Sequence, residues 1–407
     1  MITDDLKGTN FVESNNGSQQ HNVHDAQPQP RVLIFSQRNL SEVQPFRCAH
    51  FEFEDVIAEI DSVQIVAPRF SNSTQRYNFA KRLAFRTPIR LNPGVPSCSV
   101  SSSYDLFFAI CGGPSELLSI QTLRDWRRKC RRAVCLIDEL WMMNMDGYHQ
   151  YLRMLEDFDV VVLYYSQSVE SLNNRIGPKS IFVPPGVDTL RFCPYPESLP
   201  RSIDVYSVGR RSAITHDRLL QMAESGRIFY LHDSTSADRV LDPMEHRKLF
   251  ARLLKRSRYF VVNPGLIDRV DIRGGQIEIG NRYFEGAAAG AILIGERPDN
   301  GEFENCFDWP NALVDLPYGS PDFAEAIEAI ESDRQAQESI RRMNVVQSLL
   351  RHDWLYRWEA ILKAAGMNPL PKLNERKKRL RKLAGTIADS HSVELDDFFN
   401  SADSVLS

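Results

Sequence analysis

Short, wholly apolar segments alternate with segments of helical periodicity along most of this sequence, and this alternation restricts the fold more than any other feature. The apolar segments that we interpret as strands are residues 31–36, 63–67, 104–111, 133–137, 159–164 and 180–183, then 202–208, 228–232, 258–263 and 291–295. Strands that alternate with helices form parallel sheets with helices on both faces. The sequence therefore predicts an α/β protein with two doubly wound, Rossmann-like domains.

Changes in composition suggest how the chain is divided. Residues 189–200 are rich in proline and have no periodicity, so we interpret them as a linker between two domains. The expected organisation is a disordered polar tail at 1–30, an N-terminal domain at 31–188, the linker at 189–200, a C-terminal domain at 201–350, a helix at 351–366 that packs back across the domains, and a flexible tail, basic and then acidic, at 367–407.

The overall composition excludes several classes of protein. The 407 residues carry a formal net charge of −4, so the chain has no general attraction for nucleic acid. No apolar run approaches the roughly 18 residues of a membrane span, and residues 1–20 lack the apolar core of a signal peptide. The seven cysteines form no CxxC motif and no cluster with histidine, which indicates reduced thiols in a cytoplasmic protein and argues against a structural zinc.

One stretch, residues 258–296, has the pattern of a phosphate-binding turn. After its first strand, a polar loop with Gly274 and Gly275 leads to a short alanine-rich helix at 282–289. The N–H groups and the positive dipole end at the start of such a helix attract a phosphate, and Glu285 would reach a hydroxylated group attached to that phosphate. The alternative is an ordinary strand–helix–strand unit whose small residues allow close packing.

Four short motifs occur in order along the chain. They are IFVPPGVD at 181–188, VGR at 208–210, RYFEGAAAG at 282–290 and HDWLYR at 352–357. In this order and spacing they resemble the motifs of the GT-B glycosyltransferases, in particular the family 4 retaining enzymes and their spore-maturation-type branch, over about residues 31–366. The resemblance implies two Rossmann-like domains that face each other across a cleft, and transfer of a sugar from a nucleoside-diphosphate sugar.

Carried over position by position, the resemblance implies a donor site in the C-terminal domain. Arg210, with Arg211 as a second cation, would neutralise the two phosphates, whose negative charge grows as they leave. Glu285 would accept hydrogen bonds from the ribose hydroxyls. Glu278 would touch the transferred sugar, and its separation from Glu285 is one position shorter than in the family pattern. The phosphate pocket would be lined by Gly274, Gly275 and Arg282.

Each of these assignments has a structural alternative. Arg210 and Arg211 could be a surface pair that follows a strand, and Glu285 could be a solvated helix carboxylate. The flanking Phe284 and the Ala/Gly run argue that Glu285 does not face water.

The resemblance places the acceptor in the N-terminal domain. The active-site loop of the family often has a histidine after the strand that residues 133–137 match, whereas this chain has Asp138 and Glu139 there. A carboxylate at this place could position or deprotonate an acceptor hydroxyl. The alternative for Asp138 is that it caps the turn.

We therefore predict a glycosyltransferase that needs no cofactor or metal and transfers a hexose-like sugar, with retention, from a nucleoside-diphosphate sugar. The acceptor would be a glycan, a lipid-linked molecule or another hydroxyl compound, in surface polysaccharide or glycoconjugate synthesis. The alternatives are a non-catalytic binder of a nucleotide sugar or glycan, and a sugar-nucleotide epimerase of the same fold. A dinucleotide oxidoreductase is disfavoured because neither half has G-x-G-x-x-G after its first strand.

Two segments are strongly basic. Residues 115–132 are expected to form one helix with a basic end, for which a solvated face is the simpler explanation and an acidic acceptor or a membrane surface the other. The segment from Lys372 to Lys382 carries seven cations and one glutamate. It could make a peripheral contact with anionic lipid at the inner face of the membrane, or simply be a solubilising tail.

Overall fold

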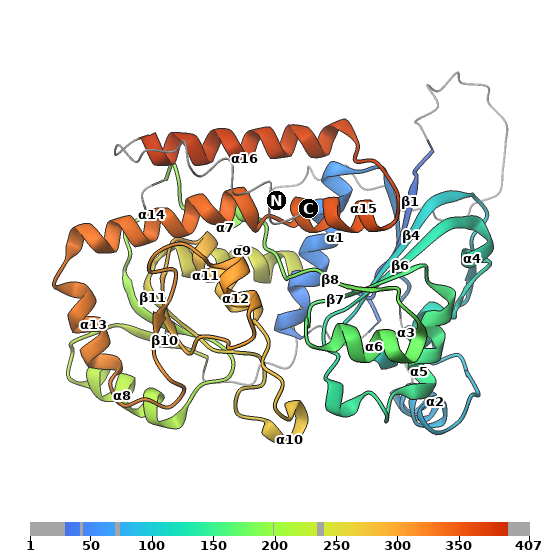
Figure 1. Cartoon of the computed structure of the whole chain (residues 1–407), viewed down its shortest axis with the longest axis horizontal. Helices are drawn as coiled ribbons and strands as arrows, with labels where there is room; N and C mark the ends of the chain where they lie inside the picture. Colours follow the sequence, from blue (N-terminus) through green and yellow to red (C-terminus); the bar gives the residue numbers. More distant parts are fainter. Residues whose placement is uncertain (1–28, 41–43, 70–73, 198, 234–239, 390–407) are drawn as a thin grey trace, which may run out of the picture.

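The computed structural model describes residues 29–40, 44–69, 74–197, 199–233 and 240–389, and Figure 1 shows them as two α/β units. Each unit is built on one parallel sheet, with helices on both faces. The predicted tail at 1–30 lies almost entirely outside the described residues. Among the helices of the described ranges, none combines the length and the apolar character that a membrane span needs.

The N-terminal sheet has six parallel strands in the order β2-β1-β4-β6-β7-β8. Their bounds are Val63–Val66 (β2), Val32–Phe35 (β1), Tyr104–Cys111 (β4), Cys130–Ile137 (β6), Val160–Leu163 (β7) and Ser180–Phe182 (β8). Successive residues of β1 enter different cores: Val32 and Ile34 lie on one face of the sheet, and Leu33 and Phe35 on the other. Burial on both faces explains why this strand is apolar throughout.

Helices from opposite ends of the chain cover the two faces of this sheet. One face packs against α1 (Cys48–Ile60) together with the last two helices described below, whose apolar residues share one core with it. The other face packs against α2 (Thr74–Arg86), α5 (His149–Leu152) and α6 (Ser168–Ile176).

The C-terminal sheet has five parallel strands in the order β10-β9-β11-β12-β13. Their bounds are Tyr230–His232 (β10), Ile203–Ser207 (β9), Ser257–Val262 (β11), Ile292–Gly295 (β12) and Val314–Asp315 (β13). The helices of this unit are α8 (Ala213–Glu224), α9 (Pro243–Lys255), α10 (Val270–Arg273), α11 (Asn281–Ala288), α12 (Glu302–Cys306) and α13 (Phe323–Glu331). The two doubly wound sheets confirm the predicted fold class, α/β with two Rossmann-like domains.

Three long helices at the end of the described chain join the units. They are α14 (Arg334–Arg351), α15 (Trp354–Ala364) and α16 (Pro371–Asp389), and they run across the upper edge of Figure 1. The ring of Trp354 stacks on Phe53 of α1 with centroids 4.6 Å apart. Gly186 leaves room for the same indole, because a Cβ at that position would lie 2.7 Å from the ring.

The predicted helix at 115–132 is wrong. These residues form α3 (Leu117–Ile120), the short strand β5 (Leu123–Arg124), α4 (Trp126–Lys129) and the start of β6, and β5 pairs with β3 (Cys98–Ser99). Asp125 has a left-handed backbone conformation with φ of 64°, which ends helical propagation. From Cys130 onward the chain pairs with β4, so sheet pairing outweighs the local helical tendency.

The expectation of a flexible tail at 367–407 is also wrong for residues 371–389, which form the ordered helix α16; residues 390–407 lie outside the described ranges. Leu373, Leu380, Ala384 and Ile387 are buried in the core that covers the N-terminal sheet. This apolar stripe has helical spacing, and the many cations between its members concealed it in the composition. The segment 189–200, expected to be a linker, begins with a helical turn, α7 (Thr189–Phe192).

One buried guanidinium connects α16 to the junction between the units. Arg376 donates hydrogen bonds to Asp353 Oδ1 at 2.9 Å and to Asp188 Oδ1 at 2.7 Å. Asp353 is the N-cap of α15 and also accepts from the backbone N–H and the hydroxyl of Thr189. Arg376 therefore holds the start of α7, the start of α15 and its own helix in one arrangement.

Arg376→Ala should lower the free energy of unfolding by about 3–5 kcal/mol, because it leaves buried carboxylates without their cation. The neighbouring Lys377 forms a partly exposed ion pair with Glu359, so Lys377→Ala should cost no more than about 1 kcal/mol. Chemical denaturation measures both. Equal, small effects would contradict the structural role assigned to Arg376.

Candidate functional site

The two sheets face a shared cleft of about 300 Å³, a volume at the lower end of the roughly 300–1,000 Å³ of small-molecule sites. The N-terminal unit contributes Phe46, Asp138, Glu139 and Tyr165, and the C-terminal unit contributes residues 208–210, 261, 263–266, 279–282 and 285. In the C-terminal sheet the cleft lies beyond the ends of β9 and β11, where the strand order reverses. Open α/β sheets bind their ligands at this position.

Helix α11 begins in this cleft. Its N-cap Gly280 and its first residue Asn281 both line the cavity. The N–H groups of a first helical turn have no partner within the helix and carry a partial positive charge, which favours an anion. Gly286 seats the helix close to the sheet, because a Cβ there would lie 2.5 Å from Leu293 and 2.6 Å from Phe260.

The structure separates the two predicted phosphate-binding arginines. Arg210 lines the cleft and forms an ion pair of 3.0 Å with Asp268, and both side chains remain partly exposed. Arg211 turns away and donates to the carboxylate of Asp233 at 2.8 Å and to its carbonyl at 2.6 Å. Arg210 is thus available to an anion in the cleft, whereas Arg211 stabilises the loop after β10 through its hydrogen bonds to Asp233.

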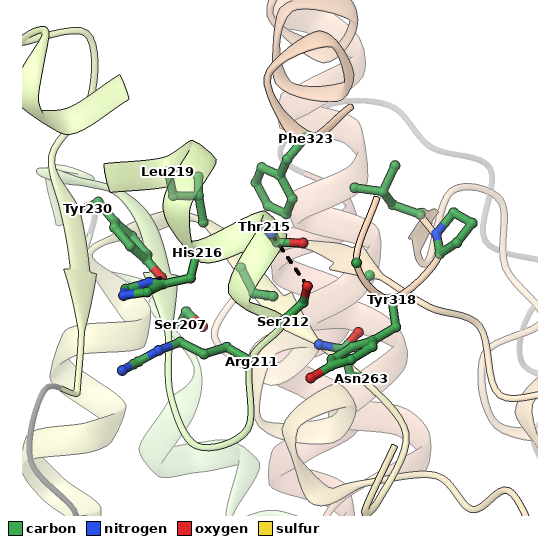
Figure 2. A pocket seen from close by; sticks show the side chains of 15 residues that line it. Ser207, Arg211, Ser212, Thr215, His216, Leu219, Tyr230, Asn263, Tyr318 and Phe323 are labelled. Carbon is green, nitrogen blue, oxygen red and sulfur yellow. Dashed lines mark hydrogen bonds between the residues drawn. The ribbon is translucent and has the colours of Figure 1, made fainter. Parts of the chain in front are cut away.

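Arg211 lines a second, smaller hollow, which Figure 2 shows with Tyr230 and His216 on one side and Asn263 and Tyr318 on the other. Its free space is about 10 Å³, roughly what one water molecule occupies. Asn263 lines the large cleft as well. The small hollow cannot hold a nucleotide in this conformation, so the large cleft is the candidate site.

Glu285 is almost completely buried at the inner end of the cleft. One of its oxygens accepts from Arg247 and the other accepts from Arg282 at 2.6 Å. Arg247 also donates to Glu52 of α1, with Nε–Oε2 and Nη2–Oε1 distances of 2.9 and 3.0 Å. Burial alone would raise the pKa of Glu52, but Arg247, Arg191 and the backbone N–H of Asp188 together outweigh burial, and the pKa lies below its usual range. Glu52, Arg247 and Glu285 form a buried charged chain between the two units.

A histidine that sequence reasoning missed pairs with the cleft residue Asp138. His50 of α1 places Nε2 2.7 Å from Oδ2 of Asp138, and both side chains are buried. Burial, reinforced by the charge of Asp138, raises the pKa of Glu139 to about 7. The predicted carboxylates thus lie in the cleft, and the imidazole comes from a distant helix instead of the loop after β6.

The predicted roles of Gly274, Gly275 and Glu278 are not supported, because none of the three lines the cleft. They belong to a long loop, residues 264–280, that docks on the N-terminal unit. Gly274, with φ of 61°, lies against Met143. Glu278 accepts hydrogen bonds of 3.2 Å from the N–H groups of Ser166 and Gln167, just before α6.

Two further contacts extend this docking. Gln276 accepts from the N–H of Met142 at 2.9 Å, and its amide nitrogen donates to the hydroxyl of Ser168 at 2.9 Å. In the described part of the chain, no group of three or more His, Cys, Asp or Glu side chains could hold a metal ion.

Comparison with known proteins agrees with this architecture. Residues 246–363, from α9 to α15, match a family described as glycosyl transferase-like. The segment includes Arg247, Arg282 and Glu285, and it is less than a third of the chain. No curated protein sequence matches the chain significantly.

Several solved structures of low sequence identity align with most of this chain. The N-terminal domain of Candida albicans trehalose-6-phosphate phosphatase is 10% identical, with a TM-score of 0.50 over 84% of this chain and 99% of that one. The catalytic domain of Arabidopsis thaliana starch synthase IV, bound to ADP and acarbose, is 9% identical, with a TM-score of 0.49 over 85% and 100%. Anabaena HepE in complex with UDP is 11% identical, with a TM-score of 0.45 over 83% and 99%. At 10% identity, the likeness to the trehalose-6-phosphate phosphatase domain concerns the fold alone. The fold is GT-B, two Rossmann-like domains facing a cleft.

The buried carboxylate of Glu278 predicts a pH-dependent stability. Burial raises the pKa of Glu278 from 4.5 to about 7. A raised folded-state pKa gives stability that is fully present below the unfolded value and is lost as pH rises through the folded value. Glu278→Gln should therefore reduce the fall in unfolding free energy between pH 4.5 and pH 7 by about 3 kcal/mol.

Urea denaturation across this pH range measures the effect. Glu338→Gln, which changes an exposed carboxylate on α14, is the control and should leave the pH dependence as in the parent protein. A parent protein and a Glu278→Gln variant with the same pH dependence would contradict the prediction.

Proposed function

We propose that the protein is a glycosyltransferase that moves a sugar from a nucleoside-diphosphate sugar to a hydroxyl acceptor. One observation carries the proposal: Arg210, the N-terminus of α11 and Glu285 meet in a single cleft that the carboxylates Asp138 and Glu139 face from the other domain. The match of residues 246–363 to a glycosyl transferase-like family supports it.

The donor diphosphate would lie between Arg210 and the first N–H groups of α11. Both are donors to phosphate oxygens, and both stabilise the negative charge that develops when the diphosphate leaves. A carboxylate has about four lone-pair sites, so Glu285 can accept from ribose hydroxyls while Arg247 and Arg282 hold its oxygens. The ion pairs fix the carboxylate in place before the donor binds.

The acceptor would enter against the N-terminal wall. In the transfer step, the bond between the anomeric carbon and the diphosphate oxygen breaks, and the acceptor oxygen bonds to that carbon from the same face that the diphosphate leaves. Glu139 takes the acceptor proton, and the diphosphate leaves with the electron pair of the broken bond. We expect the anomeric configuration to be retained, as in the enzymes that the four motifs resemble.

A second candidate function is a nucleotide-sugar binder without catalysis. The position of Glu278 favours it, because the carboxylate expected to touch the sugar binds the N-terminal domain instead. Turnover separates the two candidates: a glycosylated or hydrolysed product supports the transferase, and tight binding without product supports the binder.

Nucleotide binding tests the donor site. Thermal unfolding with UDP, GDP, ADP, CDP or dTDP should show stabilisation by one of them, of about 2.7 kcal/mol at a hundred times its dissociation constant. Arg210→Ala should weaken that binding by about tenfold or more, the loss of one charge-assisted contact. Arg227→Ala removes an exposed arginine outside the cleft and should leave binding unchanged. Stabilisation of Arg210→Ala that is as large as that of the parent protein would place the nucleotide elsewhere.

The pH–rate profile tests Glu139. Because this carboxylate must be ionised to take a proton and its pKa is about 7, kcat/KM should rise with pH up to about 7 and then level off. Glu139→Gln should lower kcat by about a hundredfold and abolish the rising limb. If kcat/KM of Glu139→Gln rose with pH as it does in the parent protein, Glu139 would not be the proton acceptor.

A further inference from the structure

Helix α2 and the segment after it expose large apolar side chains to solvent. Phe79 is 60% exposed, Phe85 43%, Ile89 52% and Leu91 42%. In the same helix only Ala80 and Ala84 are fully buried against the N-terminal unit, and Tyr77 and Leu83 are partly buried. An ordinary surface helix turns its large apolar side chains inward, so the two exposed phenylalanines of α2 and the exposed Ile89 and Leu91 mark a binding surface.

Cations surround these apolar side chains. Arg82, Arg86 and Arg90 are exposed and lie between Phe79 and Leu91 in the sequence. From residue 62 to residue 104 the chain has six lysines and arginines and no aspartate or glutamate. Exposed aromatic and aliphatic side chains interleaved with arginines suit the interface of an anionic bilayer, where rings enter the headgroup layer and guanidinium groups bind phosphates.

This surface contacts a segment that follows the N-terminal wall of the cleft in the sequence. Phe85 contacts Gly147 and the ring of Tyr148, in the segment that follows the cleft residue Glu139. Met143, in the same segment, is 63% exposed and lies beside Gly274 of the C-terminal unit. Figure 1 shows α2, α5 and α10 along one edge of the molecule, and α16 along the opposite edge.

We propose that α2 and residues 87–91 dock the protein on an anionic lipid surface, with the cleft turned toward it. Docking in this orientation would bring the N-terminal wall of the cleft to an acceptor held in the bilayer. The docking itself does not depend on the proposed transfer reaction, because it can be measured without any nucleotide.

The structure favours α2 over the basic segment from Lys372 to Lys382, which the sequence suggested for lipid contact. The apolar side chains of α16 are buried in the protein core, so none is left for a bilayer. Arg376 is held by buried carboxylates, and Lys377 by Glu359. Helix α16 as a whole lies along the edge of the molecule opposite α2.

Co-sedimentation of the full chain with vesicles tests the proposal. The parent protein should bind vesicles rich in phosphatidylserine and bind phosphatidylcholine vesicles much less. Phe79→Ser combined with Ile89→Ser should lower partitioning by about tenfold or more through lost insertion. Arg82→Glu combined with Arg86→Glu should lower it at least as much, because each basic residue near an anionic surface contributes about fivefold.

The matched control is Lys378→Glu combined with Arg379→Glu, which makes the same change of charge on α16 and should leave partitioning within about twofold of the parent. Unchanged thermal stability shows that each variant is folded. Loss of binding in the α16 variant with retention in the α2 variants would overturn the proposal. Absence of vesicle binding by the parent protein would overturn it as well. The exposed apolar face of α2 would then be expected to bind another protein.

Discussion

The buried guanidinium of Arg247 is the interaction on which the arrangement of this molecule depends. It lies between two carboxylates that would otherwise be buried charges without a partner, Glu52 on the first helix of one unit and Glu285 in the cleft of the other. Loss of one partner in such a group costs about 3–5 kcal/mol. The guanidinium of Arg247 therefore both joins the two domains and orients the carboxylate of Glu285 in the site. Without these ion pairs the two domains could move relative to each other, and the distance from Glu285 to the opposite wall of the cleft would not be fixed.

Glu52 extends this arrangement toward the junction between the domains. The same carboxylate accepts from the indole N–H of Trp354 at 3.0 Å and from the backbone N–H of Asp188 at 2.9 Å. Asp188 in turn belongs to the group held by Arg376. The chain passes between the units at Asp188 and returns at Trp354, so both crossings are tied to one helix of the N-terminal unit. The motifs at 181–188 and 352–357, which are far apart in the sequence, are thus two halves of one structural feature.

The sequence predicted what local patterns can encode. Buried parallel strands are apolar whatever their partners, so the two sheets could be predicted from the sequence. The helix after Gly280 was also predicted correctly. Four predicted site residues lie together in the cleft: Arg210, Glu285, Asp138 and Glu139. The pairing of His50 with Asp138 spans 88 positions, and that of Glu52 with Arg247 spans 195. No local pattern signals such contacts, although two glutamates within the apolar run of α1 mark an unusual helix. The same limit explains Glu278: the sequence shows a carboxylate near a glycine loop, and only the folded chain shows that the loop rests on the other domain.

The shared core of the N-terminal sheet has a consequence for the synthesis of the protein. The face of this sheet that carries Val32, Ile34 and Phe108 is completed by Trp354, Trp358 and Leu380. Domains commonly fold in order as they leave the ribosome, but here one face of the first sheet, which α1 covers in part, lacks the rest of its cover until α15 and α16 have been made. During translation the nascent N-terminal half exposes an apolar surface that its own segment cannot bury. The order of synthesis and the order of folding are therefore opposed in this chain, and its first half is the part for which chaperone protection matters most.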